Sequence, residues 1–288
     1  MRAFLILLSL ALLSSCIQEI PIHMPDKSNR LVVGSLIYPD KLISMNVSYV
    51  RLFSDSTEVN PKILEISIKE NGVLIDYPKG QGPEIYSSTY PKEGSTYELT
   101  VTTDKETVTA KTSIPTKVLI TKAESFRSAV TTADYENLTE AVITWSDPVG
   151  PNFYELQLDV WSFYQYAPID DPVLQQEGDL DYYPSTFVFS DKLFEGKTYN
   201  MTLRFSGHSN TTVLLRNVSE EYYHFKKSWH RHIWLQNTSM NVDKIREDYN
   251  IFPLLFQGDP VPLSSNFNNN LGIFAGFNQD IRQLKKRR

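Results

Sequence analysis

The residue with the most defined chemistry in this sequence is the cysteine at position 16. Cys16 is the only cysteine of the chain, and Leu13-Ser14-Ser15 places small residues directly before it. An apolar run begins at Phe4, after the positive charge of Arg2. A positive start, a short apolar run and a small-residue cleavage site are typical of a secretory signal. Cleavage between Ser15 and Cys16 frees a thiol and an amino group for acylation, so the pattern predicts lipid attachment at Cys16.

This segment has two alternatives to a lipoprotein signal. The apolar run is shorter than the roughly 20 residues that a spanning helix needs, which favours cleavage over retention in the membrane. An ordinary signal peptide whose cleavage happens to precede a cysteine is the second alternative, and the match to the whole pattern favours the lipid-attachment site. Two or more acyl chains hold a protein on a membrane where one does not. We therefore expect the membrane to be a partner through this lipid.

The sequence offers no recognisable catalytic or metal-binding motif. Gly-x-Ser-x-Gly, His-Glu-x-x-His and glycine-rich phosphate loops do not occur in it. His224, His230 and His232 are spaced by six and two residues, which places them on different faces of a helix. The acidic stretch from Asp170 to Asp181 has oxygen ligands for Ca²⁺ but lacks the order of a calcium loop, which favours a solvated loop. We predict no catalytic residue, metal or cofactor, although an enzyme can be built on any fold without a local motif.

Aromatic residues on both sides of that acidic stretch form the candidate ligand-binding set. Exposed aromatics could bind a glycan or a protein. Buried aromatics would instead belong to the core, and the sequence leaves both readings open. The set consists of Trp161, Tyr164, Tyr166, Tyr182 and Tyr183.

Charge and length restrict the function classes. The chain has 288 residues and a net charge of −6, which argues against a nucleic-acid partner. The basic run Lys285-Lys286-Arg287-Arg288 predicts a solvated tail over 279–288, with membrane or polyanion binding as the alternative. With Cys16 acylated no disulfide forms, so burial of apolar surface must hold the fold together. The length suits two packed β domains.

The elements that must position these residues are mostly strands. Residues 16–29 contain two prolines and indicate an extended tether. Short alternating segments between residues 30 and 116 predict an immunoglobulin- or fibronectin-III-like β-sandwich. Asn71-Gly72 between two of them is a strong hairpin signal. Ile114-Pro115 ends this domain, because proline removes a ladder donor.

Residues 117–278 predict a second β-rich domain that carries one long helix near 219–236. Ser219 is a candidate cap, and Glu220 and Glu221 suit the positive end of a helix. Apolar residues then follow at steps of three and four, namely Tyr222, Phe225, Trp229 and Ile233. This stripe could be a groove for a partner, but packing on a sheet is the favoured reading.

Several stretches taken together resemble the Bacteroidetes lipoprotein family of domain of unknown function 4249. The resemblance rests on the order of the motifs, which are the cysteine signal, Gly94-x-x-Tyr97-x-Leu99-x-Val101, Ile114-Pro115, Asp147-Pro148 with Asn152-Phe153-Tyr154, Asp191-x-x-Phe194-x-Gly196, and Asn270-Leu271-Gly272-Ile273-Phe274-Ala275-Gly276-Phe277. The chain departs from the family at Leu271, where a glycine is common, and in its basic tail. The resemblance implies an outer-membrane lipoprotein, facing the periplasm or the surface, in organisms where such proteins often work beside TonB-dependent transporters.

Two hypotheses of different class follow. The first is a non-enzymatic accessory lipoprotein that docks on, or delivers ligand to, a TonB-dependent transporter. The second is a free-standing surface lipoprotein that binds a glycan or a protein through the exposed aromatics.

Overall fold

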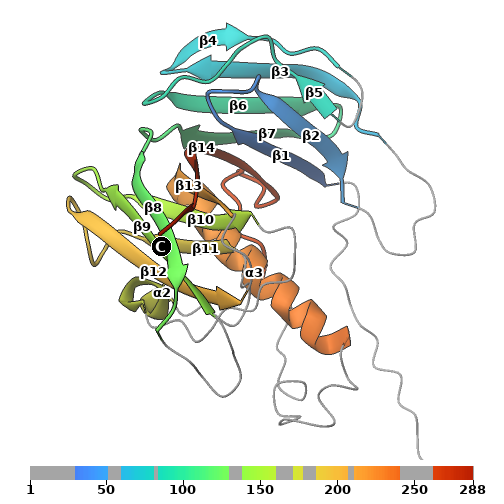
Figure 1. Ribbon diagram of the computed structural model, residues 1–288. Helices are drawn as coiled ribbons and strands as arrows, with labels where there is room; N and C mark the ends of the chain where they lie inside the picture. The colour runs from blue at the N-terminus through green and yellow to red at the C-terminus, as the bar shows by residue number, and fades with distance from the viewer. Residues whose placement is uncertain are drawn as a thin grey trace, which may run out of the picture.

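The computed structural model describes residues 30–50, 60–80, 84–129, 138–159, 171–177, 186–206, 211–240 and 262–287. These residues are mainly β, as the strand patterns predict, and form two sandwiches and one long helix (Figure 1). Within this described part, no helix has both the length and the apolar character needed to cross a membrane.

The first sandwich is built from the strands between residues 31 and 113. One sheet has the order β4-β3-β6-β7, and β1, β2 and β5 pair in the facing sheet. Their bounds are β1 (Leu31–Ile37), β2 (Ser44–Tyr49), β3 (Ile63–Glu70), β4 (Val73–Asp76), β5 (Glu84–Tyr86), β6 (Thr96–Thr103) and β7 (Thr107–Ser113). Every second residue of β1 is buried, beginning with Leu31 and Val33. The period-two alternation of the sequence is therefore the inward face of a sandwich.

The predicted hairpin lies between β3 and β4. Asn71 and Gly72 have φ angles of 50° and 82°. A two-residue turn that matches the twist of its strands needs positive φ at both central positions, which Asn-Gly provides. The side-chain oxygen of Asn71 also accepts a hydrogen bond from the Thr96 N–H at 3.0 Å, which ties the turn to β6.

The second sandwich surrounds Trp145. One sheet has the order β12-β9-β8-β15, and β11, β10 and β13 pair in the facing sheet. The bounds are β8 (Ile120–Arg127), β9 (Leu138–Ser146), β10 (Phe153–Asp159), α2 (Pro172–Glu177), β11 (Thr186–Ser190), β12 (Thr198–Ser206), β13 (Thr212–Val218) and β15 (Lys285–Lys286). The Trp145 ring is fully buried, with the rings of Tyr154 and Phe194 each 5.7 Å away. These aromatic contacts fill the centre of the sandwich.

A single strand, β14 (Gly272–Gln283), belongs to both sandwiches. Its first part pairs in parallel with β1, from Gly272 opposite Val33 to Gly276 opposite Ile37. From Phe277 onward it pairs antiparallel with β13. The result is one seven-stranded sheet in the order β11-β10-β13-β14-β1-β2-β5, which continues across both halves of the chain (Figure 1).

Gly272 shows why glycine begins β14. Its φ is +88°, and a Cβ at this position would lie 2.0 Å from the Val33 carbonyl oxygen. Only glycine combines this backbone conformation with so close an approach of two strands.

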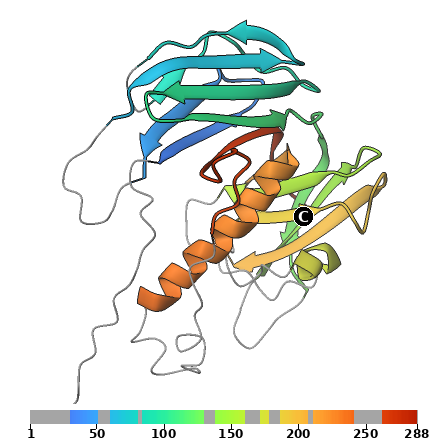
Figure 2. The ribbon, with the colours of Figure 1, turned by 180° about the vertical axis from the view of Figure 1, so that it is seen from behind.

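The long helix α3 (Glu220–Met240) packs against β14, β10 and β11, and its C-terminal end extends past the strands (Figure 2). Ser219 caps it, because its carbonyl oxygen accepts the Tyr223 N–H at 3.0 Å and its hydroxyl the Tyr222 N–H at 3.4 Å. The aromatic stripe is divided: Tyr222 is 1% exposed, whereas Trp229 is 38% exposed. Packing on the sheet therefore accounts for the first turns of the stripe only.

The structure corrects the predicted basic tail over 279–288. Residues 279–283 continue β14, and Lys285 and Lys286 form β15, which pairs in parallel with β8. Leu284 between them is 5% exposed and packs in the second core. The apolar residue just before the basic run thus packs this segment onto the sandwich, because burying Leu284 stabilises the fold.

Candidate functional site

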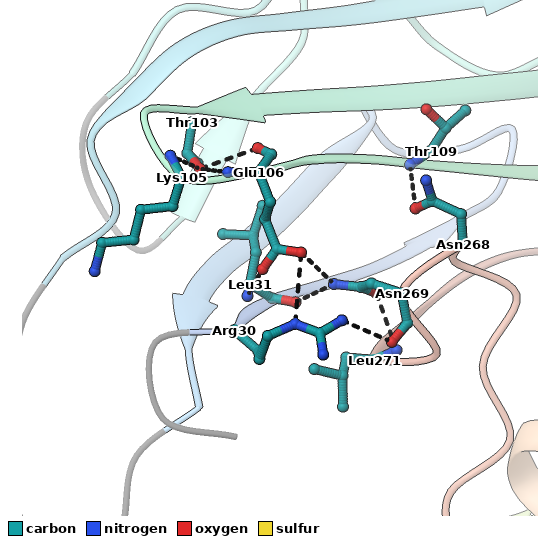
Figure 3. Close-up of polar contacts among 9 residues, drawn as sticks. All are labelled: Arg30, Leu31, Thr103, Lys105, Glu106, Thr109, Asn268, Asn269 and Leu271. Carbon is teal, nitrogen blue, oxygen red and sulfur yellow. Dashed lines mark hydrogen bonds and ion pairs between the residues drawn. The ribbon is translucent and has the colours of Figure 1, made fainter. Parts of the chain in front are cut away.

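The body of the protein begins at a polar cluster around Arg30 and Leu31 (Figure 3). The Leu31 N–H donates to Glu106, and Asn269 Nδ2 donates to the Leu31 carbonyl oxygen at 2.8 Å. The Arg30 guanidinium lies 3.7 Å from Glu106 and donates to the Asn269 carbonyl at 3.4 Å. Two segments far apart in sequence, around Glu106 and Asn269, therefore hold the first described residues in place.

The same cluster extends along β7. Asn268 and Thr109 exchange two hydrogen bonds, through the Asn268 Oδ1 at 3.1 Å and the Thr109 carbonyl at 3.2 Å. Asn266 similarly donates to the Lys111 carbonyl at 2.7 Å and accepts the Phe274 N–H at 3.0 Å. The asparagines of this loop thus use their side chains to satisfy backbone groups that no strand pairs.

A second cluster lies at the end of the second sandwich, where three sequence motifs meet. The Asp147 carboxylate accepts hydrogen bonds from the Tyr154 hydroxyl and from the Gly196 N–H, the latter at 2.7 Å. The Asp191 carboxylate accepts the Asn152 N–H at 2.7 Å. Burial raises the pKa of Asp147 and that of Asp191, and these hydrogen bonds oppose the rise. These residues hold two loops together, so their first role is structural.

A buried charge cluster fixes α3 to the sheet. Glu155 on β10 is 1% exposed and contacts Arg216, accepts a hydrogen bond from the Tyr222 hydroxyl at 2.7 Å, and lies 3.3 Å from Lys226 Nζ. Burial alone would raise the pKa of Glu155, but the charges of Lys226 and Arg216 hold it below its ordinary value. Glu155 is therefore ionised at neutral pH and fully engaged by its neighbours.

The cavity that could accept a ligand lies between β8 and the end of β14. It is an open cleft of about 790 Å³, lined by Leu119, Ile120, Thr121, Lys122, Ala123, Glu124, Ile281, Arg282, Gln283 and Lys285. One side is lined by residues of and beside β8 and the other by the end of β14, and these two strands belong to different sheets. The volume falls within the range of small-ligand sites.

The cleft mixes apolar and charged groups. Leu119 and Ile281 are 51% and 54% exposed. Lys122 lies 3.1 Å from Glu124, and Arg282 lies 3.0 Å from Asp280. Three of the lining side chains are cationic and one is anionic, so the cleft is positive in a protein whose net charge is −6. Such a site attracts acidic ligands.

Comparison with known proteins identifies the family. The profile described as Domain of unknown function (DUF4249) matches residues 17–283. The chain belongs to this family. The family expected from the order of the motifs is thus confirmed. Of the residues that carried the resemblance, Asp147, Tyr154 and Gly196 meet in the loop cluster, and Gly272 begins β14.

Other comparisons add nothing on activity. No curated protein matches this DUF4249 chain. Among solved structures, a β-glucuronidase of Parabacteroides merdae, described with glycerol in its active site, has 10% identity and a TM-score of 0.23. The match covers 66% of this chain and 23% of the glucuronidase chain. At this TM-score the match carries no argument about fold or function.

The sequence-predicted site residues of the DUF4249 chain lie outside the described residues. This holds for Ser15 and Cys16 and for the aromatic set of Trp161, Tyr164, Tyr166, Tyr182 and Tyr183. The lipid attachment at Cys16 and the ligand-binding role of the aromatic set stay predictions. Of the acidic stretch from Asp170 to Asp181, the structure describes residues 171–177, where Asp171 caps α2 and Glu177 is held by Tyr223 and Lys227.

The three histidines considered as metal ligands lie on α3, where they do not share a face. His224 is exposed and 3.5 Å from Glu220, whereas His230 is 4% exposed. Within the described ranges no group of three or more His, Cys, Asp or Glu could hold a metal ion.

Sequence reasoning did not find the cleft. Its residues come from two segments about 160 positions apart, and each segment looks like ordinary strand. The one available signal was the apolar Ile281 in a stretch that otherwise reads as polar.

Proposed function

We propose that the protein is a non-enzymatic, lipid-anchored binding protein of the outer membrane that acts as an accessory partner of a TonB-dependent transporter. The observation that carries this proposal is strand β14, which joins the two sandwiches into one body. A single body of this kind on a tether keeps a binding surface of fixed shape within reach of the membrane, which is what an accessory protein of a transporter needs.

The polar cluster at Arg30 supports the tethered arrangement. It holds Arg30, the first described residue, through Glu106 and Asn269. From Cys16 to Asn29 an extended chain reaches at most about 50 Å. Lipid attached at Cys16 would thus leave the body free to move near the membrane, while the rigid entry point limits its orientation.

The environment of the buried carboxylates supports binding rather than catalysis. A general acid or base must reach the substrate proton. Asp147, Glu155 and Glu177 instead have tyrosine hydroxyls, backbone amides or cations of the protein as their partners. Their shifted pKa values are those of groups that fasten loops and helices.

The membrane location is tested by cell fractionation of the full chain and its Cys16→Ala variant. The native protein should fractionate with outer membranes, and the mass of its mature N-terminal peptide should include acyl chains. The variant should move to the soluble fraction. Equal membrane recovery of both proteins, with no lipid mass on the native one, would contradict the anchor.

The partnership is tested by affinity purification from membranes with the lipid intact. A TonB-dependent β-barrel transporter should be recovered and identified by mass spectrometry, and its recovery should fall with Cys16→Ala. Repeated recovery of the protein without a transporter would count against the accessory role.

One observation favours a free-standing surface binder as the second candidate. The first sandwich exposes Tyr77, Tyr86 and Tyr90, each by more than half of its surface. Exposed tyrosines of this kind suit glycans and proteins. Binding of the full chain to a glycan array, lost in a Tyr77→Ala/Tyr86→Ala/Tyr90→Ala variant that remains folded, would support this candidate.

A further inference from the structure

Strand β8 has one edge that the sheet leaves partly open. Along one side it pairs with β9 from Ile120 to Arg127. On the other side β15 pairs with it only at Glu124 and Ser125. The part of β8 before Glu124 borders the cleft instead. Backbone groups of a strand point alternately to its two edges, so the N–H and C=O of Ala123 face the same edge as those of Ser125.

The chain itself shows that this edge accepts an added strand. The Arg287 N–H donates to the Ser125 carbonyl oxygen at 2.8 Å, within the parallel pairing of β15 with β8. At the far end the Ile120 N–H donates to the Asp280 carboxylate at 3.0 Å. Between these two points, no strand of the described residues pairs with this edge of β8.

The side chains around this edge indicate which kind of peptide could bind there. Lys122, Arg282 and Lys285 line the cleft with Glu124 as the only carboxylate among the lining residues. The side chains of Leu119 and Ile281 are half exposed at its walls. A strand presents alternate side chains to opposite faces, so acidic residues alternating with apolar ones match both the cations and the apolar walls.

We propose that the cleft between β8 and the end of β14 binds an extended acidic peptide, which adds to β8 as a strand in line with β15. Backbone hydrogen bonds to Ala123 supply sequence-independent affinity, and Lys122 and Lys285 select carboxylates. The proposal rests on the binding role given above and names the class of segment that a partner protein would offer.

The test uses the full chain in detergent and a fluorescein-labelled nine-residue peptide of alternating Glu and Val. Fluorescence anisotropy should show saturable binding that weakens with added salt. The same peptide with N-methyl groups on alternate backbone amides cannot pair as a strand, and it should bind at least tenfold more weakly. A peptide with Lys in place of Glu should not bind.

Two double variants are compared, and each replaces two lysines with glutamates, one pair inside the cleft and one pair outside it. Lys122→Glu/Lys285→Glu should weaken binding by about tenfold. Lys79→Glu/Lys192→Glu, on exposed loops away from the cleft, should bind as the native chain does. Lys285→Glu alone serves if the double variant does not fold.

Three outcomes overturn the proposal: equal binding of the N-methylated peptide, equal binding by the folded cleft variant, or no binding at about 1 mM peptide. None of them alters membrane fractionation or transporter recovery, so failure of the peptide site is distinguishable from failure of the proposed function.

Discussion

Gly276 of β14 lies directly against the carbonyl oxygen of Ser113 at the end of β7. A Cβ on Gly276 would be 2.1 Å from that oxygen and 2.8 Å from Ile114 Cδ1. The contact occurs at the residue where β14 changes partner, because Gly276 is the last to pair with β1 and Phe277 the first to pair with β13. The Ser219 N–H also donates to the Gly276 carbonyl at 2.8 Å, so α3 begins at the same point.

Gly276→Ala should therefore lower the free energy of unfolding by about 2–3 kcal/mol, because backbone must shift to admit the methyl group. Urea denaturation followed by tryptophan fluorescence measures the change. Gly34→Ala is the matched control, since a Cβ there meets no atom within 4 Å. Its stability should equal or slightly exceed that of the native protein. Equal stability of the two variants would contradict the role given to Gly276.

Glu106→Ala should loosen the start of β1. The Leu31 N–H then loses its acceptor, at a cost of about 1–3 kcal/mol. Hydrogen exchange should show faster exchange at Leu31, with the amides of the second sandwich unchanged. Glu65→Ala, on the exposed face of β3, is the control. If exchange at Leu31 stayed at its native rate, the cluster around Arg30 would not fix the chain entry.

Glu155→Gln should lower the free energy of unfolding by about 1–3 kcal/mol, because Arg216 and Lys226, whose side chains are 20% and 24% exposed, would lose the buried carboxylate with which they pair. Adding Lys226→Met should restore part of the loss. The coupling is measured as a double-mutant cycle in urea. Strictly additive effects would mean that Lys226 and Glu155 do not interact as the structure describes.

Glu177 predicts a specific pH dependence. Burial alone would raise its pKa, but the Tyr223 hydroxyl, the Ser190 N–H and Lys227 hold the pKa below the ordinary value of 4.5. A carboxyl with a depressed folded-state pKa stabilises the fold above pH 4.5, and this contribution is lost as the pH falls through the folded-state pKa. Glu177→Gln should thus be less stable than native at pH 7, by about 1–3 kcal/mol.

The difference between the native and Glu177→Gln proteins should shrink as the pH is lowered below 4.5. Asp147 and Asp191 have raised pKa values and act in the opposite sense, but they are common to both proteins and cancel in the comparison. A stability difference that stayed constant from pH 7 to pH 3 would rule out an ionised Glu177 as its source.

Local structure could be predicted where short-range chemistry decides it. The alternating segments expected between residues 30 and 116 form strands such as Leu31–Ile37, and Asn71-Gly72 forms the expected turn. Ser219 caps the helix because its side chain and the two glutamates after it favour that end. In each case the residues adjacent in sequence are enough to predict the local structure.

Long-range pairing could not be predicted in the same way. The parallel pairing of Val33 with Gly272 joins residues from opposite ends of the chain. The residues around one strand do not indicate that the other strand is its partner. The cleft also depends on long-range pairing, because Ile281, Arg282 and Gln283 are placed by β13, and Lys285 by β8. The candidate site was therefore out of reach of sequence patterns, while the fold class was not.

The shared strand has a consequence for biosynthesis. Most chains complete their N-terminal domain while the ribosome is still adding residues. Here β1 pairs with a strand that begins at Gly272, so the seven-stranded sheet can reach its final order only after that strand has been synthesised.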